Sequence, residues 1–154
     1  MVLTAWTTCP YVARDGQVNP DVRTLNGPDA INSVSQSIIY NAIASVIKRN
    51  SSYSQKAASF IDVFFLNDPT RVNPNMNFGQ IVRGPGKSGQ EGTFTGVLDL
   101  RGIVKIINGI LVLKASNSPY WTSARDGAMS NWMAQYAGWL QNSNLGLASA
   151  SRPK

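Results

Sequence analysis

The chain has 154 residues, of which 43% are hydrophobic and 14% are charged; it has no histidine, and its formal net charge is +6. A chain of this size is expected to fold as one domain, residues 1–154, that buries roughly 68–70% of its unfolded surface, and the apolar content excludes a disordered protein. No apolar run approaches the ~20 residues of a membrane helix. The lack of histidine excludes imidazole-dependent triads and histidine metal sites.

The cysteine count and the distribution of cations limit the classes of cofactor and partner that we expect. The single cysteine, Cys9, excludes an internal disulfide and a cysteine-rich metal site, and we expect neither a metal nor a cofactor. Cations are dispersed along the chain, whereas nucleic-acid binders concentrate them on one face or motif. We therefore expect no nucleic acid and no membrane as a partner. The basic excess fits either solvated surface charge or an anionic ligand.

The first predicted helix follows an irregular stretch, residues 6–28, that proline and glycine punctuate. Asp29 is the predicted N-cap, and Lys48 and Arg49 suit the C-terminal end of the helix dipole. Apolar residues recur between them every three or four positions, as one face of a helix requires: Ile31, Val34, Ile38, Ala42 and Val46.

A short turn, Asn50-Ser51-Ser52, separates this helix from a second one. The triplet is also an N-glycosylation sequon, a pattern that often arises by chance. The second helix is predicted from an apolar stripe that ends before Asn67: Tyr53, Ala57, Phe60, Ile61, Phe64 and Phe65. The short turn predicts an antiparallel helical hairpin.

Residues 67–98 form a long Gly- and Asn-rich segment with little helical period, and such connections are commonly functional or disordered. We interpret it as an ordered binding loop. Four of its amide side chains suit sugar recognition, although asparagine also serves turns: Asn73, Asn75, Asn77 and Gln80. Between Pro69 and Gly92 the only acid is Glu91, against the three cations Arg71, Arg83 and Lys87, which predicts an anion-facing surface. The glycines at 84–89 do not have phosphate-loop spacing.

Two further helices are predicted after this loop. Asp99 is the expected N-cap of a third, heavily buried helix that extends to about Leu113. Thr122 or Ser123 caps a fourth, whose aromatic residues at helical spacing are interpreted as core: Trp132, Tyr136 and Trp139. The tail from Asn142 to Lys154 is expected to fray. The result is an all-α chain of two helical hairpins joined by one large loop.

Three separated segments resemble the alginate lyase-like family of polysaccharide lyases, most closely its fungal branch. They are residues 11–20 (Tyr-Val-Ala-Arg-Asp-Gly-Gln-Val-Asn-Pro), 73–80 (Asn-Pro-Asn-Met-Asn-Phe-Gly-Gln) and 92–99 (Gly-Thr-Phe-Thr-Gly-Val-Leu-Asp). The resemblance implies an α/α toroid that cleaves acidic polysaccharide, of alginate or glucuronan type, by β-elimination. It also implies a secreted protein, although the sequence shows no signal peptide.

The same resemblance implies which roles have a counterpart here. Family members use asparagine and histidine to neutralise the uronate carboxylate and tyrosine for proton transfer, but this chain has no histidine, and we assign it no catalytic residue. We expect an incomplete toroid, about the N-terminal half of a family member, with weak or no activity. The expected substrate-binding residues are Arg14, Asn73, Asn75, Asn77, Gln80, Arg83 and Lys87. The alternative is a non-catalytic protein that binds anionic glycans or another partner.

An oligomer is a further expectation. A truncated toroid exposes an apolar flank on its third or fourth helix, and such patches tend to be covered.

Overall fold

The structure, a computed structural model, describes residues 16–17, 26–81, 85 and 91–151. These residues form helices and no strand, which confirms the all-α prediction. The elements in chain order are α2 (Gly27–Ile47), α3 (Ser51–Ile61), the π-helix η2 (Asp62–Leu66), the 3₁₀-helix η4 (Phe94–Leu100), α4 (Ile103–Ala115), α5 (Ser123–Asn142) and α6 (Asn144–Ala150).

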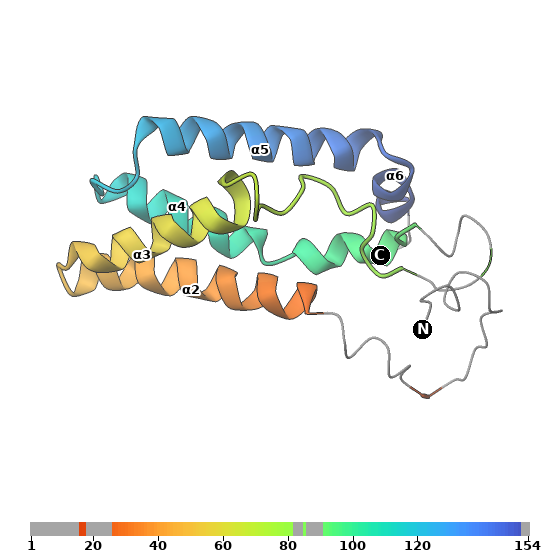
Figure 1. Ribbon diagram of the computed structural model, residues 1–154, viewed down its shortest axis with the longest axis horizontal. Coiled ribbons are helices and arrows are strands. Elements are labelled where there is room, and N and C mark those ends of the chain that lie inside the picture. The colour runs from red at the N-terminus through yellow and green to blue at the C-terminus, as the bar shows by residue number, and fades with distance from the viewer. Residues whose placement is uncertain (1–15, 18–25, 82–84, 86–90, 152–154) are drawn as a thin grey trace.

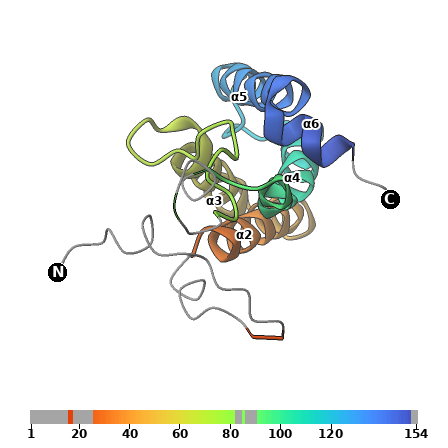
Figure 2. The ribbon, with the colours of Figure 1, turned by 90° about the vertical axis from the view of Figure 1, so that its right-hand side faces the viewer.

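The helices pack around one apolar core. Figure 1 shows α2 and α3 as an antiparallel hairpin, and Figure 2 shows α3 and α4 side by side between α2 and α5. The predicted first hairpin is therefore confirmed. In the second predicted pair, α4 and α5 run in opposite directions, but α4 packs chiefly against α2. Of the described helices, none combines the length and apolar character needed to cross a membrane.

The start of α2 differs from the prediction. The helix begins at Gly27 with Asn26 in the N-cap position, so the prediction that Asp29 caps it is wrong. Pro28 occupies the first turn, where its missing N–H costs no hydrogen bond and its fixed φ suits a helix. Asp29 lies in the same turn, where its carboxylate interacts favourably with the helix dipole.

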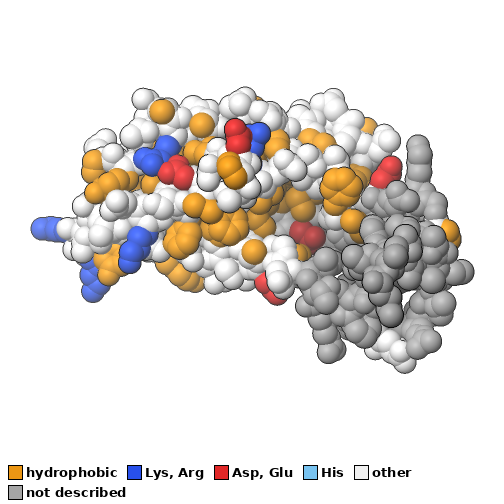
Figure 3. Space-filling view, in the orientation of Figure 1, with side chains coloured by type: hydrophobic (Ala, Val, Ile, Leu, Met, Phe, Trp, Pro, Cys, Tyr) orange, Lys and Arg blue, Asp and Glu red, His pale blue; other side chains and the backbone are white. Residues whose placement is uncertain are grey.

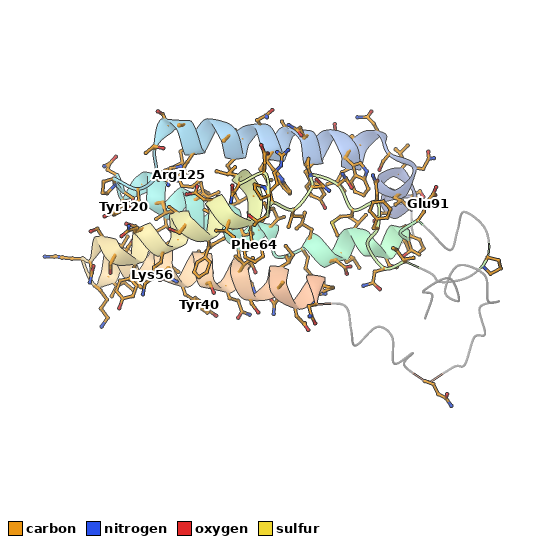
Figure 4. All side chains as sticks on the ribbon, in the orientation of Figure 1. Tyr40, Lys56, Phe64, Glu91, Tyr120 and Arg125 are labelled. Atoms are coloured by element: carbon orange, nitrogen blue, oxygen red, sulfur yellow. The ribbon has the colours of Figure 1, made fainter. Side chains whose placement is uncertain are left out.

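Helix α3 continues into a π-helical turn that an ion pair holds. Arg125, in the first turn of α5, donates from Nε to Asp62 Oδ1 over 2.9 Å and from Nη2 to Oδ2 over 2.7 Å. The hydrogen bonds with Asp62 raise the pKa of Arg125. Arg125 also donates to the carbonyl of Tyr120 over 2.8 Å, so one guanidinium joins η2, α5 and the preceding turn (Figure 4).

Helix α4 lies close to α2 because two of its contacts are made at glycine. A Cβ on Gly109 would lie 2.9 Å from Ile38 Cγ2, and one on Gly102 would lie 2.8 Å from Ser35 Oγ. Gly102 also takes the N-cap position of α4, so the prediction that Asp99 caps this helix is wrong. Asp99 instead lies within η4, where the chain makes a separate 3₁₀ segment before α4 begins.

Helix α5 supplies an aromatic row to the core. Thr122 caps it by accepting a hydrogen bond from the N–H of Arg125, as one of the two predicted caps requires. Trp132 and Tyr136 are only 3% and 6% exposed, which confirms their interpretation as core. The rings of Trp132 and Tyr136 stack at 5.6 Å, and those of Tyr136 and Trp139 at 6.0 Å.

The chain after α5 is not simply frayed. Residues Asn144–Ala150 form α6, and Ser143 caps it by accepting a hydrogen bond from the N–H of Gly146 over 3.0 Å. Helix α6 packs against both α5 and η4. The expected fraying is therefore wrong for these residues, because a serine cap and tertiary packing stabilise a short helix that composition alone did not suggest.

Candidate functional site

The amide-rich segment 73–80 is an ordered loop that α5 holds in place. Trp132 Nε1 donates to the carbonyl of Val72 over 2.9 Å, and Trp139 Nε1 donates to Asn77 Oδ1 over 2.8 Å. Asn75 Oδ1 accepts from the N–H of Asn77 over 3.2 Å. Two of the predicted sugar-binding amides thus use their oxygen atoms within the protein. Asn75 stabilises a local turn, as the alternative interpretation predicted, whereas Asn77 joins the loop to α5.

The second half of the loop crosses directly over this segment at three glycines. The N–H of Gly92 donates to the carbonyl of Asn77 over 2.6 Å, and that of Thr93 donates to Gly79 over 2.9 Å. A Cβ on Gly79 would lie 2.9 Å from the carbonyl oxygen of Gly96, and one on Gly92 would lie 2.6 Å from that of Gly79. Glycine is therefore needed at these positions because the two backbone segments of the loop pack directly against each other.

Gln80 joins the two halves of the loop to η4. Its Nε2 donates to Asp99 Oδ1 over 2.7 Å, and its carbonyl accepts from Thr93 Oγ1 over 3.1 Å. The backbone of Gln80 has a φ of 54°, in the left-handed region. Non-glycine residues rarely occupy this region, and those that do concentrate at functional sites, where the surrounding structure holds them.

A cleft of about 470 Å³ opens beside this hydrogen bond. Four segments contribute to it: the first turns of α2, the loop at Gln80, the end of η4 and the start of α4. Its lining residues are Pro28, Ile31, Asn32, Gln80, Asp99, Arg101, Gly102 and Lys105. The cleft therefore combines an apolar patch with two amides, a carboxylate and two cations, a set that can contact both the hydroxyl groups and the acid group of a sugar acid.

The two cations of the cleft have no partner among the described residues. Arg101 and Lys105 are four residues apart and exposed, and no ion pair joins either one to another described side chain. The first turn of α4 holds no acidic residue. Cations at the amino end of a helix are electrostatically unfavourable, so an anion bound between Arg101 and Lys105 would be stabilised by both side chains and by the helix dipole.

The predicted site residues divide into three groups. Gln80 lines the cleft, whereas Asn73, Asn75 and Asn77 lie in the adjoining loop. Arg14, Arg83 and Lys87 lie outside the described residues. Sequence reasoning missed the four other polar and charged residues of the cleft: Asn32, Asp99, Arg101 and Lys105. Spacing was an available signal, since cations four residues apart at the start of a helix share one face.

Two other titratable clusters have structural roles. Lys114 Nζ donates to both carboxylate oxygens of Asp126 over 2.9 Å, and Trp121 Nε1 donates to Oδ1 over 3.0 Å, which together lower the pKa of Asp126. Burial raises the pKa of Tyr136, so its phenol is a weaker acid than that of an exposed tyrosine. In the described part of the chain, no group of three or more Cys, Asp or Glu side chains can hold a metal ion.

Comparison with known proteins finds similarity to a family model and to solved structures. A family model described as alginate lyase matches residues 4–153. The chain also superposes on the crystal structure of an alginate lyase from Bacteroides ovatus with a TM-score of 0.80 and 29% sequence identity. This superposition covers 95% of the chain but 37% of the Bacteroides protein, so the chain spans well under two thirds of that relative. No curated protein shows significant similarity to the chain.

Proposed function

The chain belongs to the alginate lyase family, and we propose that it binds acidic, uronate-containing polysaccharide in the cleft between α2, η4 and α4. The unpartnered pair Arg101 and Lys105 carries this proposal. A uronate carboxylate between these side chains would form charge-assisted hydrogen bonds, which are stronger than those between neutral groups. The polysaccharide class follows from the family, whose substrates are acidic.

The rest of the cleft suits the hydroxyl groups of the same sugar. Asp99 uses Oδ1 for the amide of Gln80, which leaves Oδ2 to accept a hydrogen bond from a hydroxyl. Asn32 adds an amide that both donates and accepts. In the adjoining loop the ring of Phe78 is 69% exposed and presents an apolar face on which a sugar ring can stack.

Residues outside the described part complete the proposal. Arg14, Arg83 and Lys87 remain proposed contacts to the polysaccharide, and Arg83 and Lys87 follow Gln80 closely in the chain. Asn73, Asn75 and Asn77 remain proposed contacts through their amide nitrogens. The oxygens of Asn75 and Asn77 already accept hydrogen bonds within the protein.

We assign binding to this chain, and weak or no cleavage. The C5 proton of a uronate is removed only when its carboxylate charge is neutralised, a base accepts the proton and an acid protonates the leaving oxygen. The cleft offers cations for the first of these tasks. The chain has no histidine to share that task as it does in the family, and loss of one electrostatic stabiliser of the transition state typically costs about 10²–10³ in rate.

One pair of measurements distinguishes a lyase from a non-catalytic binder. The chain is incubated with alginate and with glucuronan while the ultraviolet absorbance of unsaturated uronate is followed, and calorimetry measures binding of the corresponding oligosaccharides. Binding with little or no absorbance gain supports the proposal. Rapid absorbance gain would show that the chain holds its own proton-transfer groups, and absence of binding would contradict the function.

Two properties of the molecule belong to the same proposal. Family members are typically extracellular, and we propose that this chain is secreted.

We also propose that the chain self-associates through α4, where Val104 and Leu111 are 60% and 56% exposed and lie seven residues apart, on one face of the helix. Light scattering of the purified chain tests the second point, and a strict monomer would contradict it.

A further inference from the structure

The turn between α2 and α3 contains a feature that polysaccharide binding does not explain. Asn50-Ser51-Ser52 is the only Asn-X-Ser/Thr triplet in the 154 residues with X other than proline. We propose that Asn50 is an acceptor for an N-linked glycan. The proposal rests on the secretion part of the proposed function and is independent of the cleft.

The triplet lies where a modifying enzyme can reach it. Asn50, Ser51 and Ser52 are all exposed, and Figure 1 places them at the tip of the α2–α3 hairpin. Arg49 has a φ of 48°, which reverses the chain immediately before Asn50. Asn50 itself is extended, with φ −127° and ψ 111°, so the acceptor residue stands outside both helices.

The hydrogen bonds of Asn50 are compatible with a sugar on its side chain. Its Oδ1 accepts from the N–H of Ser52 over 2.9 Å and thereby caps α3. Its Nδ2 has no hydrogen-bond partner among the described residues, nor does the hydroxyl of Ser52. Because an N-linked glycan is carried on the nitrogen and leaves the amide oxygen in place, the modified residue still caps α3.

The transfer is a substitution at the first carbon of a sugar. The co-reactant is an oligosaccharide linked to a polyprenyl diphosphate. A bond forms between Asn50 Nδ2 and the sugar C1 while the bond from C1 to the diphosphate oxygen breaks. The amide nitrogen loses one proton, the polyprenyl diphosphate leaves with the electron pair, and nothing is oxidised or reduced.

The position of Asn50 separates the glycan from the polysaccharide cleft. The cleft includes the first turns of α2, whereas Asn50 follows the other end of this 21-residue helix (Figure 1). Beside the turn, Val46 and Ile47 are 48% and 71% exposed, and hydrophobic side chains reach the surface at this end of the molecule (Figure 3). A glycan here would shield apolar surface without obstructing substrate.

The test expresses the full chain behind a secretion signal in yeast and recovers it from medium and from protease-protected vesicles. Intact mass is measured before and after removal of N-glycans by an amidase. We expect one glycan on the wild-type chain, none on Asn50→Asp or Ser52→Ala, and an unchanged glycan on Ser51→Ala. Asn50→Asp keeps an oxygen that caps α3, so loss of the glycan is separated from loss of folding.

The outcomes are decisive because entry into the secretory pathway is imposed. Wild-type chain that is inside vesicles or in the medium but carries no glycan would overturn the proposal. A glycan that persists in Asn50→Asp or Ser52→Ala would also overturn it. Calorimetry with uronate oligosaccharides on the same samples tests the proposed function separately, and we expect equal affinity with and without the glycan.

Discussion

Gln80 Nε2 donates to Asp99 Oδ1 over 2.7 Å, and this hydrogen bond connects residues 19 positions apart at the edge of the cleft. The bond holds the amide-rich loop against η4 and fixes one oxygen of a carboxylate that lines the cleft. Because Gln80 has a positive φ, the backbone contributes to the geometry as well as the side chain. We therefore predict that the side chain of Gln80 contributes more to the binding of uronate oligosaccharide than to the stability of the fold.

Replacing Gln80 by glycine or by alanine tests this prediction. Glycine keeps the positive φ without strain, whereas alanine retains it at a cost, but both remove the amide. We expect both variants to weaken uronate-oligosaccharide binding roughly threefold to tenfold, as loss of a hydrogen bond worth about 0.5–1.5 kcal/mol implies. Calorimetry measures this effect. Wild-type affinity in Gln80→Gly would show that the amide does not contribute.

The indole of Trp139 gives a test of how the loop is anchored. Trp139→Phe keeps an aromatic ring beside Tyr136 but removes the donor to Asn77 Oδ1. We expect a loss of about 0.5–1.5 kcal/mol in the free energy of unfolding, measured with urea. Hydrogen exchange reports the location of the change, with faster exchange at the N–H of Gly92 expected. Unchanged exchange there would contradict the anchoring role.

Glycine positions in the loop and in α5 are predicted to respond oppositely to alanine. A Cβ on Gly79 would lie 2.9 Å from a backbone oxygen, whereas one on Gly127 in α5 meets nothing within 4 Å. Gly79→Ala is expected to destabilise the chain by about 1–3 kcal/mol, in the range of overpacking. Gly127→Ala should stabilise it by about 0.5–1 kcal/mol, as alanine does in a helix interior. Urea unfolding of the two variants checks both signs.

The lowered pKa of Asp126 predicts part of the acid sensitivity of the fold. A carboxyl whose folded pKa is depressed contributes stability above its unfolded pKa and loses it as pH falls through the folded value. The hydrogen bonds from Lys114 and Trp121 place that folded value below 3.8. Asp126→Asn should therefore show a shallower loss of urea stability on the acid side of 3.8, and Lys114→Met should show the same trend. Wild-type pH dependence in both variants would contradict this role.

Helical periodicity predicted much of the fold. The apolar stripe through Ile31, Ile38 and Ala42 identified α2, and the aromatic spacing in α5 identified its buried face. Helix starts were harder because Asp29 and Asp99 are good capping residues by type. Pro28 and the 3₁₀ segment η4 nevertheless fix where the helices begin. The capping propensity of a residue type does not show whether a neighbouring proline or 3₁₀ segment sets the start of the helix instead.

The candidate site was only partly visible in the sequence. The family resemblance identified the segment that contains Gln80, but Asn32 reaches the same cleft from a helix 48 positions earlier in the chain, as their residue numbers show. Arg101 and Lys105 already lay at the amino end of the predicted third helix, and their spacing was a signal that the sequence offered. Whether an acidic side chain forms an ion pair with either cation depends on the tertiary structure, which one sequence does not show.

Calorimetry with paired oligosaccharides tests whether Arg101 and Lys105 bind the carboxylate of a uronate. Wild-type chain and the Arg101→Gln/Lys105→Gln double variant are titrated with an oligouronate and with its carboxyl-reduced, neutral counterpart, at low and at raised salt. Lys56→Gln is a control for loss of a cation elsewhere, because Lys56 lies on α3 (Figure 4) and does not line the cleft. We expect salt-sensitive binding of the oligouronate by wild type and Lys56→Gln. We also expect the affinity of the double variant to be lower by roughly tenfold or more, in line with charge-assisted hydrogen bonds of about 1.5–3 kcal/mol. Equal affinity of the double variant and wild type for the oligouronate would contradict this expectation.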